Sequence, residues 1–278
     1  MKKIKKITNK IYILAYKEDV RQLENWFQQQ GFSVSVCRRN YTQQELSFST
    51  TIRALTNHRD AWSAIVASGE AGIVVESDFV PITEFGDAYA PFDPDISPIA
   101  VGWLYGGANL YRFDKGGYAI GHCSTAVALL ITELAAPKLV KFADEEIKKS
   151  RGKYSIWDSY MSHGLRREMD VPTYIPFKQF GEHGGLSSNP EHKKHKIREW
   201  HQADILLGPL AFMPAYARGS VLRYRLLRLR ANIRGLLRVF LGKYIAPCVF
   251  KSSDKKNMMI KFLFYKWFSR RKAFITTP

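Results

Sequence analysis

The sequence predicts an α/β fold in which helices flank a mostly parallel sheet. Two observations support this: strand-like and helix-like segments alternate over residues 11–76, and several strand candidates are short aliphatic runs bounded by glycine or polar residues. Segments in β-α-β order are typical of parallel sheets. The chain has 278 residues, of which 46% are hydrophobic, so it can form one large domain with an appendage or two small domains.

The amino-terminal elements are the clearest. The helix candidates carry apolar residues at helical spacing and end at a glycine, whereas the strand candidates are aliphatic or alternate between apolar and polar residues. In chain order we expect a strand at 11–15, a helix at 19–30, a strand at 32–37, a loop at 40–50, a helix at 51–68 and a strand that bears Glu76.

Glycine and proline clusters divide the elements that follow. In chain order we expect a loop at 87–98, a strand at 99–104, a hairpin or flexible loop between Gly106 and Gly117, a strand leading into a helix at 125–143, a helix at 155–168 and a strand at 171–175. The composition changes abruptly beyond Pro214. We therefore expect a domain at residues 1–213 and an extension at residues 214–278.

The extension is strongly basic. Residues 216–278 hold 16 lysine and arginine residues and one acid, Asp254, and so carry +15 of the net charge of +17. Large apolar and aromatic residues are mixed with the basic ones in two stretches, 223–241 and 258–268. Helices of this composition lie in membrane interfaces, where each basic residue near an anionic leaflet adds ~1 kcal/mol. We expect the extension to associate with an anionic membrane surface.

Two other interpretations of the extension stay open. The basic helices could pack on the domain, in which case the boundary after residue 213 is misplaced. They could also bind nucleic acid, but the high apolar content and the lack of a recognised nucleic-acid motif argue against it. No window approaches ~18 uninterrupted apolar residues, so we expect no transmembrane helix. The apolar run at residues 11–16 is too short for the core of a signal peptide.

The most informative segment is residues 71–79, in which three aliphatic residues run into Glu76 and Asp78. Residues i and i+2 of a strand share a face, so we expect the two carboxylates side by side where the strand opens into a loop. Two close carboxylates repel each other, and a hard divalent cation relieves the repulsion and can also hold substrate phosphates. Acidic pairs at strand ends are also common surface features, so the pair alone does not decide the matter.

Residues 55–79 resemble glycosyltransferase family 25, the lipooligosaccharide glycosyltransferases. The pattern of that family is a leucine-serine-histidine helix with a downstream tryptophan, followed by a strand that ends in Glu-Asp-Asp. Here Asn57 replaces the serine and Ser77 replaces the middle acid. The resemblance extends more loosely over residues 10–190. The residues that match the pattern are His58, Trp62, Glu76 and Asp78.

The resemblance implies a GT-A-like, Rossmann-type fold. It implies transfer of a sugar from a nucleotide-sugar donor to a lipooligosaccharide, a lipopolysaccharide or another cell-surface glycan. It also implies a divalent metal, Mn²⁺ or Mg²⁺, on Glu76 and Asp78, which would both contact the donor. His58 would contact the donor or orient the acidic loop, and Arg59 would pair with Asp60 or with a donor phosphate.

Two later residues complete the site that the resemblance implies. Asp158 aligns with an acidic residue at the start of a late helix and would take the proton of the acceptor hydroxyl in inverting transfer; a helix cap is the alternative. His183 lies in a segment like the family's late Gly/Ser segment, and several GT-A families place a late histidine on the metal; a surface histidine is the alternative. We expect residues 121–126 on the acceptor side.

Histidine and cysteine give no further metal signal. The cysteines are far apart, as in reduced thiols of a cytosolic protein, and three histidines among basic residues read as a solvated helix rather than a zinc site. These residues are Cys37, Cys123, Cys248, His192, His195 and His201.

The sequence thus favours a cytoplasmic glycosyltransferase that is peripheral on the inner face of the cell membrane. Two rivals remain. Because Ser77 departs from the family pattern, the chain could be a catalytically impaired relative that acts as a membrane-bound partner. Because the extension is basic, it could be a nucleic-acid-binding protein.

Overall fold

The computed structural model describes residues 2–185, 194, 202–245 and 247–268. Eight strands form one sheet in the order β2-β1-β3-β8-β5-β9-β7-β6. Their bounds are β1 Lys10–Ala15, β2 Ser33–Arg38, β3 Gly72–Glu76, β5 Val101–Trp103, β6 Ala108–Phe113, β7 Ala119–Cys123, β8 Ala128–Ile131 and β9 Thr173–Tyr174. Six strands run in one direction, because only β7 and β8 pair antiparallel with both of their neighbours. The expected mostly parallel sheet is therefore confirmed for strand direction.

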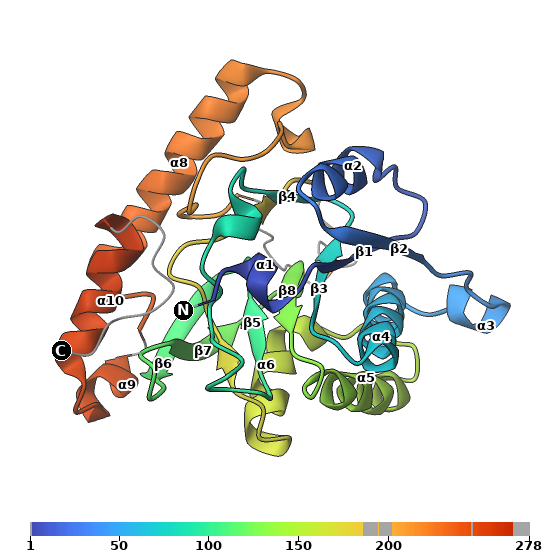
Figure 1. The fold of residues 1–278 in the computed structure, drawn as a ribbon, viewed down its shortest axis with the longest axis horizontal. Coiled ribbons are helices and arrows are strands. Elements are labelled where there is room, and N and C mark those ends of the chain that lie inside the picture. Colours follow the sequence, from blue (N-terminus) through green and yellow to red (C-terminus); the bar gives the residue numbers. More distant parts are fainter. Residues whose placement is uncertain (1, 186–193, 195–201, 246, 269–278) are drawn as a thin grey trace.

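A second, two-stranded antiparallel sheet joins distant parts of the chain. It pairs β4 Phe79–Pro81, which follows β3 almost directly, with β10 Gly181–His183. The helices surround both sheets (Figure 1). Their bounds are α1 Ile4–Ile7, α2 Arg21–Gln29, α3 Gln43–Leu46, α4 Thr50–Ser68, η1 Phe85–Asp87, α5 Ala136–Ser150, α6 Trp157–Glu168, η2 Ala215–Ala217, α8 Val221–Phe240, α9 Pro247–Ser252 and α10 Lys256–Phe268.

The alternation along β1 explains why both faces of the main sheet are covered. Tyr12 and Leu14 belong to one hydrophobic cluster, together with residues of α4, α5 and α6. Ile11 and Ile13 belong to the other cluster, together with Leu23 of α2. Successive strand residues point to opposite faces, so a continuous apolar run serves two helical layers at once.

The expected elements are present, most with ends that differ by one to three residues, but α5 continues to Ser150, seven residues beyond the expected end at 143. The expected loop at 40–50 contains a short helix, α3, because Thr42 and Glu45 form a reciprocal cap: the Thr42 hydroxyl accepts from Glu45 N, and the Glu45 carboxylate accepts from Thr42 N. The open choice between a hairpin and a flexible loop is settled, since β6 and β7 pair antiparallel and Gly116 and Gly117 lie in their turn.

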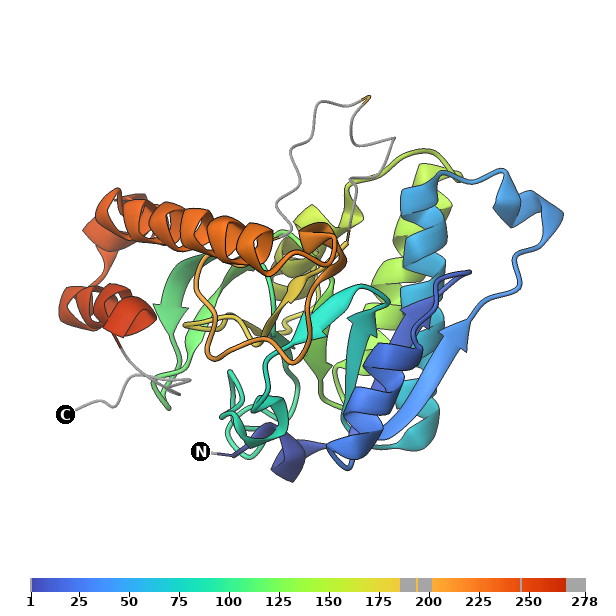
Figure 2. The ribbon, with the colours of Figure 1, turned by 90° about the horizontal axis from the view of Figure 1, so that it is seen from above.

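The basic extension packs on the domain near β6 (Figures 1 and 2). Met259 and Phe262 of α10 are buried in the same cluster as Leu110 of β6. The Leu110 backbone N–H donates to the Tyr244 carbonyl at 2.8 Å. Residues on both sides of position 213 thus share one core, which matches the packed-extension alternative. The two-part division remains a prediction about folding in isolation.

Helix α8 carries its apolar residues on the outside. Its buried residues are Arg228, Ala231 and Gly235, whereas leucine, isoleucine and phenylalanine side chains along the opposite face are at least half exposed. Within the described part of the chain, no helix is both long enough and apolar enough to cross a bilayer. We call the exposed row the α8 stripe; its residues are Leu222, Leu226, Leu229, Ile233, Leu237 and Phe240.

Candidate functional site

Glu76 and Asp78 meet at the carboxyl end of β3. The strand ends at Glu76, and Ser77 and Asp78 form the tight turn that leads into β4. The sequence argument put both carboxylates on one strand face; the structure instead places Asp78 in the turn. Glu76 is two residues from Val74 and so points to the side of the sheet that α4 covers.

His183 reaches the same place through the small sheet. β10 pairs with β4 so that His183 lies opposite Phe79, the residue after Asp78. The Gly184 N–H donates to the Asp78 carbonyl at 2.7 Å and fixes this register. As a result His183 Nε2 lies 2.8 Å from Asp78 Oδ2 and 3.9 Å from Glu76 Oε2.

The three side chains suit a divalent cation. One ligand atom from each of Glu76, Asp78 and His183 lies within 4.8 Å of the other two. Two ligand atoms on opposite sides of a cation with bonds of about 2.2 Å lie about 4.4 Å apart. The three ligand atoms therefore need to approach one another only slightly to bind one ion. Carboxylate oxygen and imidazole nitrogen are accepted by Mn²⁺ and related ions. Each side chain is 23–34% exposed, which leaves room for water or phosphate as further ligands.

His58 contacts the carboxylate of Glu76 from the buried side. It is 1% exposed, and its Nε2 lies 3.3 Å from Glu76 Oε1. Its ring packs against Trp62 at 5.5 Å and Trp157 at 5.1 Å between centroids. His58 is on α4, which is capped by the Ser49 hydroxyl and stops at Gly69 with φ of 61°, a value that favours glycine. The geometry fits the expected orienting role of His58 rather than direct donor contact.

A cavity of about 630 Å³ opens beside Glu76 and His183, within the range of small-molecule sites. Asp158, the second residue of α6, lines it. Asp158 Oδ1 also accepts a hydrogen bond of 2.9 Å from Ser159 N within the first turn of α6, but the N-cap residue is Ile156, so Asp158 is not the cap. His122, Ser124 and other residues of 121–126 lie in the same wall.

His122 is held by a hydrogen bond between its Nδ1 and the Ser162 hydroxyl at 2.6 Å. Burial lowers the pKa of His122, and the nearby Arg166 and His163 lower it further. The lowered pKa favours the neutral form of the imidazole. His122 therefore lines the cavity as a hydrogen-bonding group rather than as a fixed cation.

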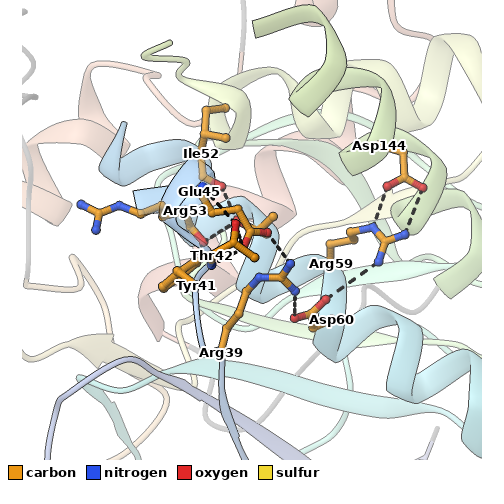
Figure 3. Close-up of polar contacts among 10 residues, drawn as sticks. Arg39, Tyr41, Thr42, Glu45, Ile52, Arg53, Arg59, Asp60 and Asp144 are labelled. Atoms are coloured by element: carbon orange, nitrogen blue, oxygen red, sulfur yellow. Dashed lines mark hydrogen bonds and ion pairs between the residues drawn. The ribbon is translucent and has the colours of Figure 1, made fainter. Parts of the chain in front are cut away.

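Arg59 is not brought to the site. Its Nε donates to Asp144 Oδ1 of α5 at 2.6 Å, and Asp60 lies 3.8 Å from its Nη1 (Figure 3). It is not among the described residues that line the cavity. The expected pairing with Asp60 is present as a longer contact, whereas the expected contact with a donor phosphate has no support from this geometry.

The sequence argument missed a group of cavity residues that α8 contributes. Arg234 and Arg238 line the cavity together with Asp204. The sequence held only a weak signal: Arg238 falls on the face opposite the α8 stripe, but a helical projection places Arg234 close to the exposed Arg223 and Arg230. The partner Asp204 lies about 30 residues away in an irregular segment, and that pairing leaves no local pattern. His192, His195 and His201 lie outside the described residues.

Comparison with protein-family models and with curated proteins finds no match. Among solved structures, one similar chain is described as the crystal structure of a glycosyltransferase involved in the glycosylation of the major capsid of PBCV-1. The likeness covers 61% of this chain and 82% of that chain, with a TM-score of 0.40 and 9% identity. A likeness of this degree carries no functional argument, so function is argued from the site itself.

Proposed function

We propose that this chain is an inverting, metal-dependent glycosyltransferase that moves a sugar from a nucleotide-sugar donor to a cell-surface glycan such as a lipooligosaccharide. One observation carries the proposal: Glu76, Asp78 and His183 converge from distant parts of the chain at a cavity that Asp158 also lines. The resemblance of residues 55–79 to glycosyltransferase family 25 supports the same activity.

Each residue has a role in this chemistry. A divalent cation, Mn²⁺ or Mg²⁺, supplies positive charge for the diphosphate that leaves the donor. Glu76, Asp78 and His183 hold it, and His58 keeps Glu76 in place through the 3.3 Å contact. Asp158 accepts the proton of the acceptor hydroxyl as that oxygen attacks the anomeric carbon. The cavity walls hold both substrates close together and limit the access of water.

The acceptor that we propose is a glycolipid or a lipid-linked oligosaccharide at an anionic membrane, on the cytoplasmic leaflet. The α8 stripe supports this, because it lies between the exposed arginines Arg223, Arg225 and Arg230. An apolar face bordered by cations matches a lipid surface with negative headgroups. A nucleic-acid surface needs the cations but not the stripe, so the lipid partner is favoured.

Mn²⁺-dependent release of nucleotide tests the proposal. The full chain is incubated with a panel of nucleotide sugars, with and without Mn²⁺, and we expect at least one to be hydrolysed only with the metal. Asp78→Ala and His183→Ala should each lower this rate about 100-fold or more, because loss of the metal removes several kcal/mol of transition-state stabilisation.

Glu70→Ala is the matched control, since Glu70 lies before the other end of β3 and pairs with Lys10 at the surface, 3.1 Å away. It should leave hydrolysis unchanged. If the chain binds Mn²⁺ and donor but hydrolyses none, the catalytically impaired alternative replaces the proposal. Ser77→Asp then shows whether the departure from the family pattern is the cause.

A further inference from the structure

The inner face of α8 places two guanidinium groups at the cavity. Arg234 and Arg238 are four residues apart, so they lie on the same side of the helix, and both line the cavity. Arg238 Nη2 lies 3.8 Å from the position that a Cβ atom on Gly107 would occupy. Arg238 therefore borders the connection between β5 and β6.

A single carboxylate holds both arginines. Arg234 Nε donates to Asp204 Oδ1 at 2.5 Å, and Arg238 Nη1 donates to Asp204 Oδ2 at 2.7 Å. The Tyr244 hydroxyl donates to the same Oδ2 at 2.8 Å. Burial of Asp204 opposes its ionisation, but the two guanidinium groups outweigh burial and hold its pKa below the ordinary value. One negative charge is thus divided between two cations.

These arginines are suited to an anion rather than to structural pairing alone. Each guanidinium is a planar fork of five N–H donors; Asp204 engages one side of each fork, and Arg234 Nη2 also donates to the Gln202 carbonyl at 2.6 Å. The side chain of Arg238 remains 34% exposed although it is at a cavity wall. Forks of this kind bind phosphate or carboxylate groups through paired hydrogen bonds.

The strand order separates Arg238 from Glu76 of the metal trio (Glu76, Asp78 and His183), although Asp204 follows Ala203, whose N–H donates to the Glu182 carboxylate. Four strands (β8, β5, β9 and β7) stand between β3, which ends at Glu76, and β6, which begins beside Gly107. The cavity is also lined by Asn109 of β6 and by His122, its partner across the strand pair on β7. A donor diphosphate on the trio is thus served by the β3 side, and the α8 side is left for the other substrate.

We infer that Arg234 and Arg238 form a subsite for an anionic group, a phosphate or a carboxylate, on the acceptor. The inference rests on the proposed function, because that function makes the cavity a two-substrate site. Asp204 is a positioning residue that holds the two forks side by side. The same helix would then meet the membrane with its outer face and an anionic acceptor with its inner face.

Titration calorimetry with metal-free protein in EDTA tests the subsite without donor or metal. The probes are inorganic phosphate, glucose 6-phosphate and glucuronate, which separate phosphate from carboxylate recognition. Arg238→Gln should weaken binding of the preferred probe roughly 10- to 100-fold, as expected for loss of a charge-assisted hydrogen bond. Arg230→Gln removes the same charge from an exposed residue, one turn before Arg234, that is not among the described residues lining the cavity, and it should change nothing.

Two further variants, Arg238→Lys and His183→Ala, show where the anion binds and whether it needs the guanidinium. Arg238→Lys keeps the charge but not the fork, and we expect affinity between those of the wild type and Arg238→Gln. Thermal unfolding shows that each variant is folded. Equal affinities for Arg238→Gln and Arg230→Gln would overturn the inference. So would affinity that falls in His183→Ala but not in Arg238→Gln, since the anion would then lie at the metal trio. Absence of donor hydrolysis contradicts the proposed function but leaves this binding result intact.

Discussion

Helices α4 and α8 are almost equal in length but attach to the protein in opposite ways. α4 buries Ile52, Leu55, Trp62 and Ile65 against the sheet. α8 buries Arg228, Ala231 and Gly235 and turns its leucines outward. The first is held by apolar burial, whereas the second is held by ion pairs with buried acids. The difference indicates that α8 has two working surfaces, and that its outer surface is available to a partner.

The ion pairs of α8 lead directly to the candidate site. Arg228 Nη1 donates to Glu182 at 2.6 Å, and Glu182 is the residue before His183. Glu182 is fully buried, and it also accepts from the Tyr216 hydroxyl and from Ala203 N. Burial raises its pKa, although Arg228 opposes the shift. Successive residues of a strand point to opposite faces, so Glu182 and His183 of β10 point in opposite directions. The ion pair that holds Glu182 against α8 therefore leaves His183 directed at Glu76 and Asp78.

Deletion of residues 216–278 is expected to have the largest effect. It strips Glu182 and Asp204 of their cationic partners, and each unpaired buried charge costs about 3–5 kcal/mol. It also removes Met259 and Phe262 from the core. The total is comparable to the about 5–15 kcal/mol that stabilises a typical protein. Circular dichroism should show no cooperative unfolding transition. A truncated chain that melts cooperatively would instead restore the independent domain at 1–213.

Paired substitutions in the two helices sharpen the contrast. Leu55→Ala in α4 should lower the free energy of unfolding by about 2–5 kcal/mol, because Leu55 is fully buried. Leu229→Ala in α8 should change it by less than about 0.5 kcal/mol, because Leu229 is 56% exposed. Urea unfolding of both variants measures the difference. Similar losses would mean that the outer face of α8 is packed against part of the protein.

Lys266 of α10 should make the stability of the protein depend on pH. It is fully buried, its Nζ donates to the Phe177 carbonyl at 3.0 Å, and it lies 4.3 Å from the centre of the Tyr244 ring. Burial lowers its pKa to about 7, although Asp204 opposes the shift. Between about pH 7 and pH 10 the unfolded chain then binds more protons than the folded chain, so stability should rise with pH in this window.

Lys266→Met tests this dependence on pH, since methionine keeps the chain length without the charge. The difference in unfolding free energy between wild type and Lys266→Met should change by a few kcal/mol from pH 7 to pH 10, with the wild type gaining. Chemical denaturation at several pH values gives the two curves. Parallel curves would show that the Lys266 ammonium is solvated in the folded protein.

The α8 stripe should affect membrane binding but hardly stability. The triple variant Leu226→Gln, Leu229→Gln, Ile233→Gln should lose most sedimentation with vesicles that contain anionic lipid, because the apolar face no longer enters the interface. The matched control puts glutamine at three exposed apolar positions elsewhere: Leu46, Ile96 and Leu134. If the triple variant still binds vesicles, the stripe has another partner. A dimer that dissociates in the triple variant would identify a second copy of the chain.

Local patterns were enough for most of the amino-terminal half and for the place of Glu76, although not for Asp78, which lies in the turn after β3. Periodicity and the cap residues around α4 give its limits to within one residue, and the aliphatic run into Glu76 gives β3. His183 was predicted only through a family resemblance, because its approach depends on the pairing of β10 with β4, about 100 residues away in the chain. Long-range pairing of this kind leaves no periodic trace in the sequence.

The inner face of α8 could not be predicted for a related reason. Composition marks Arg228, Arg234 and Arg238 as basic residues of an amphipathic tail, like their exposed neighbours. Only the tertiary structure supplies Glu182 and Asp204 as partners and so turns the polar face inward. The rule that apolar faces are buried predicts the opposite orientation, and buried acids override it here.

Direct measurement of Mn²⁺ binding tests the central claim, that Glu76, Asp78 and His183 form one metal site. Electron paramagnetic resonance follows the signal of free Mn²⁺ as the full chain is added. We predict one bound ion per chain for the wild type and for Glu70→Ala, and affinity at least about 10-fold weaker for Asp78→Ala and for His183→Ala. Unchanged Mn²⁺ affinity in His183→Ala and Asp78→Ala, with both variants folded, would contradict the account.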